Sequence, residues 1–186
     1  MSTTAARPDP LATLESLDPA GYAFTRSAWV DAPPARVYQL VGDVSAISRW
    51  SPNATDAAYD QDAGPRIGAW FSGHNRKDGR EWTTRSQVVR AEPAAAFGFI
   101  VGGVENGIVQ WDWTFHPQGR GTIVEQSWQL LRLDPVLGTT RADLDDLRRY
   151  MADSVEVTLS SMAQFFAGDC STEAAHPALR QNQAIG

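Results

Sequence analysis

The chain has 186 residues, 42% of them hydrophobic and 20% charged, with a formal net charge of −6 at pH 7. This length and composition predict one globular domain that buries about 70% of its unfolded surface, and they argue against a disordered chain. The acidic balance argues against a nucleic-acid partner, because binding to a phosphate backbone requires clustered Lys and Arg. One cysteine and three histidines argue against an internal disulfide and a zinc site, so we expect no metal and no cofactor.

The two ends of the sequence differ from its middle. Residues 1–20 are rich in Pro, Ala, Ser and Thr without a sustained apolar period, and residues 169–186 are small and polar, so both predict flexible segments flanking a domain over 21–168. The first residues lack the basic and apolar regions of a secretory signal, and no apolar run approaches the ~20 residues of a membrane span. We therefore expect a cytoplasmic protein without a membrane span.

The domain begins with a strand followed by two short helices. Residues 22–31 mix apolar and polar side chains and predict the first strand. The run Ala32-Pro-Pro-Ala favours a helix start, because proline fixes the backbone angle of the first turn. Apolar residues at helical spacing then predict a helix over 36–44, and a second short helix over 45–50 ends at Ser51-Pro52.

A run of antiparallel strands follows, without a crossover helix between them. Turn signals such as Lys77-Asp78-Gly79 and the segment from Pro117 to Gly121 separate the strands as hairpins. The predicted strands cover 54–60, 69–76, 80–91, 96–101, 108–116 and 122–133.

The last predicted element is a long helix over 141–167, whose apolar residues form one stripe and which Gly168 is expected to end. Such a helix spans roughly 40 Å but is only about 10–12 Å across, whereas six or seven strands form a sheet roughly 30 Å wide. One helix cannot cover that face. The sheet must therefore curl around the helix, and large side chains, a partner or a ligand must fill the remaining space.

Strand alternation predicts which side chains face the helix. In 108–116 the apolar row predicts an inward face, and in the next strand Gln126 lies on an otherwise apolar row beside Trp128. In 80–91 the inward row is predicted to hold Trp82, Thr84, Ser86 and Val88. Residues 69–76 leave two alternatives, with either Phe71, Gly73 and Asn75 or Trp70, Ser72 and His74 facing inward.

The order of the elements and several local strings resemble the helix-grip superfamily that includes START-like domains and the birch-pollen-allergen fold (SRPBCC), in its polyketide cyclase/dehydrase-like branch. The strings are Ala32-Pro-Pro-Ala-Arg-Val-Tyr38, Gly42-Asp43, Arg49-Trp50-Ser51-Pro52, Gly73-His74-Asn75-Arg76, Trp82, Ala91-Glu92-Pro93, Trp111 to Phe115 and Gly121-Thr122. The resemblance implies an α+β fold with a curved antiparallel sheet of six or seven strands wrapped around a long C-terminal helix, and two short helices after the first strand. It also implies a hydrophobic cavity between sheet and helix.

These observations favour a carrier or sensor that binds a hydrophobic small molecule, such as a lipid, a polyketide or another ring-bearing metabolite. A cyclase/dehydrase-like enzyme and a protein-interaction module without a ligand are the alternatives, and a homodimer stays open. Pockets of this class are mostly apolar with a few placed polar groups. The candidate ligand-binding residues are Trp50, Phe71, Asn75, Trp82, Thr84, Ser86, Phe99, Trp111, Trp113, Gln126, Trp128, Met151 and Val155.

Two interpretations of these residues compete. The tryptophans are either core filler or the wall of a cavity, and the inward polar groups bond either one another, a buried water or a ligand. A catalytic residue is not evident: Asp112 and Glu125 fall on outward faces, and His74 points inward only in the second register of 69–76.

Overall fold

The structure, a computed structural model, describes residues 17–77 and 79–174, with side chains described for 17–76 and 79–168. Seven strands and one long helix make up most of the fold. The strands are β1 (Ala23–Val30), β2 (Ala54–Tyr59), β3 (Trp70–Lys77), β4 (Arg80–Glu92), β5 (Ala96–Val101), β6 (Val109–Gln118) and β7 (Gly121–Leu130). The α-helices are α1 (Pro34–Gly42), α2 (Gly103–Asn106) and α3 (Arg141–Ala174), and the 3-10 helices are η2 (Pro19–Gly21), η3 (Val44–Arg49) and η4 (Asp60–Asp62).

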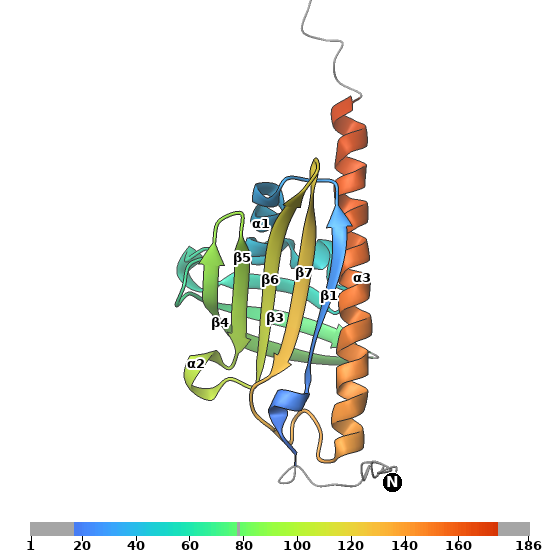
Figure 1. Ribbon diagram of the computed structural model, residues 1–186. Helices are drawn as coiled ribbons and strands as arrows, with labels where there is room; N and C mark the ends of the chain where they lie inside the picture. The colour runs from blue at the N-terminus through green and yellow to red at the C-terminus, as the bar shows by residue number, and fades with distance from the viewer. Residues whose placement is uncertain (1–16, 78, 175–186) are drawn as a thin grey trace, which may run out of the picture.

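The seven strands form one antiparallel sheet in the order β1-β7-β6-β5-β4-β3-β2. Strands β2 to β7 pair with one another in chain order, and β1 joins out of sequence, beside β7. The edges of the sheet are therefore β1 and β2. Figure 1 shows α3 running the length of the domain beside β1 and projecting beyond the strands at its C-terminal end. This α+β architecture is the predicted helix-grip fold.

The ends of the fold differ from the prediction. α3 continues past Gly168 to Ala174, so the predicted helix end at Gly168 is wrong. The reason is that Gly168 does not adopt the left-handed backbone by which a glycine ends a helix. At the other end, Leu17 is buried in the core and η2 follows it, so residues 17–20 are part of the folded domain. The remainder of the predicted arm and tail, 1–16 and 175–186, lies outside the described residues.

The sheet has an inner face toward α3 and an outer face, and the strand register decides between the alternatives for β3. Phe71 pairs with Ser86 and Gly73 with Thr84, and Phe71 is only 3% exposed whereas the side chain of His74 is largely exposed. The inner face therefore takes Phe71, Gly73 and Asn75. The same alternation places Phe97 and Phe99 of β5 beside Trp113 and Trp111 of β6.

The outer face carries the acidic and histidine side chains of the strands. Every Asp, Glu and His in the described part of the seven strands alternates onto this face. Asp112 is half-buried on this face and lies against Gly98 of the neighbouring strand, where a Cβ atom would collide with it. Gln110 Nε2 donates a hydrogen bond to Asp112 Oδ2 at 2.5 Å, and burial raises the pKa of Asp112.

Burial of the ionised Asp112 carboxylate destabilises the folded state, and the substitution Asp112→Asn should remove this pH-dependent destabilisation. A carboxyl whose folded-state pKa is raised stabilises the fold fully below its ordinary pKa of 3.8, and that contribution is lost as pH rises through the folded-state pKa. We expect the free energy of unfolding of the variant, relative to wild type, to rise with pH over this window and then level off. Urea unfolding at a series of pH values measures it. Asp153→Asn, on the exposed side of α3, is the control, and a difference that does not change with pH would contradict the assignment.

Candidate functional site

The space between the inner face and α3 is lined by aromatic rings in mutual contact. Phe71 and Phe99 meet edge to face at 4.9 Å between ring centroids, and Phe99 lies 5.6 Å from Trp113. Trp113 in turn contacts Trp50 at 6.3 Å and Trp111 at 6.2 Å. These rings come from β3, β5, β6 and the residue that ends η3, so they form a continuous aromatic surface across the middle of the sheet.

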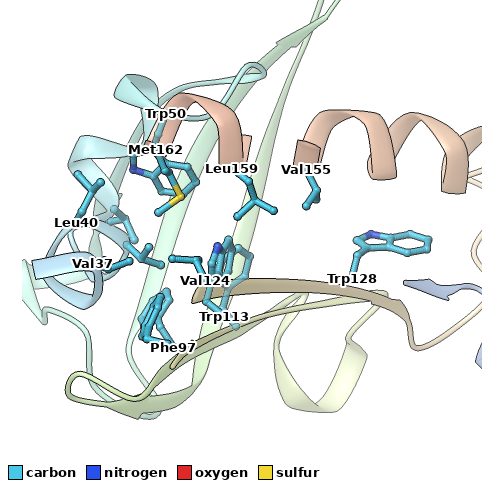
Figure 2. Packing of buried hydrophobic residues seen from close by; sticks show 14 of the residues in the cluster. Val37, Leu40, Trp50, Phe97, Trp113, Val124, Trp128, Val155, Leu159 and Met162 are labelled. Carbon is cyan, nitrogen blue, oxygen red and sulfur yellow. The ribbon is translucent and has the colours of Figure 1, made fainter. Parts of the chain in front are cut away.

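One end of this interior is closed by α1 and η3. In Figure 2, Val37 and Leu40 of α1 and Trp50 lie together with Phe97, Trp113 and Met162. Sequence explains the local fold, because Pro34 begins α1 and the Asp43 side chain accepts a hydrogen bond from Ser45 N to start η3.

A half-buried tyrosine fixes this closed end to the sheet. Tyr59 of β2 donates a hydrogen bond from its hydroxyl to the Gly42 carbonyl at 2.9 Å. Burial, followed by the proximity of Tyr38 and Asp43, raises the pKa of Tyr59 well above its ordinary value. The neutral hydroxyl is thus held in place as a donor, and α1 stays fixed against β2.

At the β3–β4 hairpin the inner face reaches solvent. Asn75 Nδ2 donates to Thr84 Oγ1 at 3.3 Å, and both side chains are half-buried. Trp82 pairs with Asn75 across the strands, so it lies on the inner face as predicted, but it is 41% exposed and not part of the buried row. The reason is its position two residues after the start of β4, at the end of the hairpin. The β3–β4 hairpin thus forms a margin with two polar side chains and one exposed indole.

α3 is held at both edges of the sheet. On the β1 side, Arg26 Nε donates to Glu156 Oε1 at 2.9 Å and Arg148 Nε donates to the Ala23 carbonyl at 3.2 Å. On the β2 side, Asn53 receives a hydrogen bond from the Tyr150 hydroxyl at 2.6 Å and donates to Ser154 Oγ at 2.9 Å. Because Asn53 immediately precedes β2, α3 bridges the gap between the two edges of the sheet, β1 and β2. We call this gap the seam.

Three buried polar atoms of the interior have no hydrogen-bond partner among the described residues. They are Nε1 of Trp50, Nε1 of Trp113 and Oε1 of Gln126. An unpaired buried polar group costs on the order of 1–3 kcal/mol, and most such groups in folded proteins are paired. These three atoms lie among buried aromatic and aliphatic side chains of the core.

The structure brings most of the candidate residues to one surface. Asn75, Thr84, Trp111 and Met151 are half-buried, and Trp82 is exposed. Sequence reasoning missed Arg26, although strand alternation in β1 would have placed it on the inner face. It also missed Asn53, whose loop position carries no periodic signal. The candidates that are buried are Trp50, Phe71, Ser86, Phe99, Trp113, Gln126, Trp128 and Val155.

Other kinds of site find little support in the described residues. No cluster of three or more metal-ligating side chains occurs among them. No described helix combines the length and the apolar character that crossing a membrane would require. The aromatic interior beneath α3 is the candidate site of this fold, because its rings and unpaired polar atoms lie together there.

Comparison with known proteins agrees with this geometry. The family model described as polyketide cyclase/dehydrase and lipid transport matches residues 22–166, which is most of the chain. The chain belongs to this family. No curated protein matches the sequence.

Three solved structures illustrate the relationship. A polyketide cyclase-like protein from Corynebacterium glutamicum, Cgl2372, is 27% identical, with a TM-score of 0.54 over 84% of this chain and 96% of its own. The di-domain aromatase/cyclase StfQ of the steffimycin pathway is 19% identical with a TM-score of 0.64, covering 81% of this chain but 52% of its own. Ara h 8.0201 is 12% identical with a TM-score of 0.57, covering 78% and 97%. The last two, at such identity, show the shared fold alone.

The hydrogen bonds of Asn53 predict a measurable contribution to closing the seam. Asn53→Ala removes both bonds to α3, and we expect the free energy of unfolding to fall by about 1–3 kcal/mol. Amide hydrogen exchange around Tyr150 and Ser154 should become faster at the same time. Asn106→Ala, at an exposed position in α2, is the control and should leave both quantities unchanged. Equal behaviour of the two variants would show that α3 does not depend on this contact.

Proposed function

We propose that the protein binds a hydrophobic, ring-bearing small molecule, such as a lipid or a polyketide, between the inner face and α3, as a carrier or sensor. The observation that carries this proposal is the aromatic surface that extends from the closed end at Trp50 toward the half-buried Asn75–Thr84 pair. Apolar walls with a few placed polar groups are typical of small-molecule sites. The family, which includes lipid-transport and cyclase proteins, supports the same kind of ligand.

The positions of the titratable side chains favour a ligand carrier over an enzyme that works by acid–base catalysis. A cyclisation or dehydration step needs a general base close to the reacting carbon. In the described strands the carboxylates and imidazoles lie on the outer face, and Arg26, on the inner face, is bound to Glu156. The inner face offers amides, hydroxyls and indoles, which orient a ligand without exchanging protons at neutral pH. A single cysteine also suits the reducing cytoplasm, where we propose the carrier works.

The first experiment is native mass spectrometry of the purified protein, followed by organic extraction of any bound molecule. A co-purified lipid, polyketide or isoprenoid would support the proposal and identify the ligand chemistry. The same spectrum reports whether the protein is a monomer or a homodimer. Protein that has lost its ligand is tested with anilinonaphthalene sulfonate, whose fluorescence rises in apolar surroundings. The dye is first bound to the protein and then displaced by added hydrophobic molecules. If neither method detects binding, the interaction-module hypothesis replaces this one.

A substitution on the inner face should separate internal binding from binding at the surface. Gly73 lies on the inner face of β3, and a Cβ atom there would make ordinary contacts, the nearest at 3.4 Å from Thr84 Oγ1. Gly73→Leu should fold but fill the space beside Asn75 and Thr84. We expect the affinity for anilinonaphthalene sulfonate to fall by about tenfold or more, because the loss of a few contacts is worth at least ~1.4 kcal/mol.

The adjacent substitution Ser72→Leu is the matched control, because its side chain leaves the opposite face of the same strand. It places the same leucine side chain on the outer face without entering the interior. If both variants bind the dye as wild type does, the dye does not occupy the inner face. Circular dichroism of the two variants verifies that each is folded.

A further inference from the structure

Two of the unpartnered polar atoms belong to neighbouring residues. Trp113 of β6 and Gln126 of β7 pair directly across the sheet, so both side chains rise from the inner face side by side. They are 3% and 4% exposed, and Trp113 Nε1 and Gln126 Oε1 are each without a hydrogen bond among the described residues. One atom is a donor and the other an acceptor, yet they do not bond to each other.

The surrounding side chains do not satisfy this pair. Arg26, which pairs with Gln126 from the other side, donates instead to Glu156 and to the Thr25 carbonyl. Figure 2 shows Leu159 of α3 pointing toward the strands next to Trp113, and Val155 pointing the same way farther along the helix, toward Trp128. Both are apolar and provide neither a donor nor an acceptor from their side chains.

We infer that this pair is a binding site for a hydroxyl group of the ligand. A hydroxyl is the simplest group that can do both tasks at once: its oxygen accepts from Trp113 Nε1 and its hydrogen is donated to Gln126 Oε1. A ketone oxygen would accept from the indole but leave Gln126 Oε1 unpaired, and a hydrocarbon would leave both unpaired. The proposed ligand is therefore a ring-bearing phenol or alcohol. This inference rests on the proposed function, because it names the chemistry of the same interior.

Three probes with one ring system test this inference: fluorenol, fluorenone and methylfluorene, which present a hydroxyl, a carbonyl and a methyl group at the same carbon. The quantity measured is the ratio of dissociation constants, methylfluorene over fluorenol, from quenching of tryptophan fluorescence or by calorimetry. Comparing this ratio between variants cancels the difference in hydrophobicity of the two probes. Gln126→Leu should lower the ratio about tenfold, because it removes the acceptor of the ligand hydroxyl.

Trp113→Phe should lower the same ratio by removing the indole N–H, although it also reduces ring volume. Gln126→Leu keeps the volume and is expected to fold at least as stably as wild type, because it removes an unpaired buried amide oxygen. Two controls carry the same chemical changes on the outer face: Gln129→Leu on β7 and Trp29→Phe on β1. Each should leave the ratio within about twofold of the wild-type value.

The outcomes separate the inference from the function on which it rests. A ratio that falls with Gln126→Leu and Trp113→Phe but not with the controls supports the hydroxyl site. Equal ratios in all five proteins, with binding retained, overturn the hydroxyl site and leave internal binding in place. Tighter binding of fluorenone than of fluorenol also overturns it, because the pair would then present two donors. If wild type binds none of the three probes, both the site and the proposed function are wrong.

Discussion

The attachment of α3 to β1 and to Asn53, the residue before β2, is the constraint on which the interior of this protein depends. A curled antiparallel sheet has two open edges, and here α3 joins them through Arg26 and Arg148 on the β1 side and Asn53 on the β2 side. α3 packs against β1 and β7, while the inner faces of β3 to β5 lie farther across the domain. The space between them must be filled by the chain's own aromatic rings or by a ligand.

The aromatic rings of the inner face fill part of the space beneath α3, and they also form a surface suited to binding an apolar ligand. Phe71, Phe99 and Trp113 meet at ring distances and angles common for buried aromatic pairs, which stabilises the sheet without polar contacts. The surface they form ends at Asn75 and Thr84, where hydrogen-bonding groups reach solvent. A molecule entering from this margin would meet polar groups first and apolar rings deeper in. That order suits a ligand with a large apolar body.

Most of the fold could be predicted from the sequence, because strand alternation and helical spacing are local signals. The inward rows of β6 and β7 follow from alternation alone, and Gln126 stands out there as the one amide on an apolar row. The exposure of Trp82 could not be predicted, since alternation gives the face of a residue but not how far α3 covers it. The role of Asn53 likewise depends on two residues of α3 about one hundred positions away. Continuation of the helix through Gly168 reflects backbone angles that glycine permits but does not dictate.

The unpaired atoms of Trp113 and Gln126 oppose stability, and this is the strongest physical reason to regard the interior as a site. Replacing both with apolar residues of similar size would remove two desolvated polar groups at little cost in packing. Arg26, a charged side chain that pairs with Gln126 across the inner face, is directed to Glu156, so it tethers α3 and leaves Gln126 Oε1 without a partner. Departures of this kind from local rules are expected where a protein recognises a ligand. A hydroxyl-bearing ligand would remove the cost when it binds, so the desolvation already present in the free protein would add to its affinity.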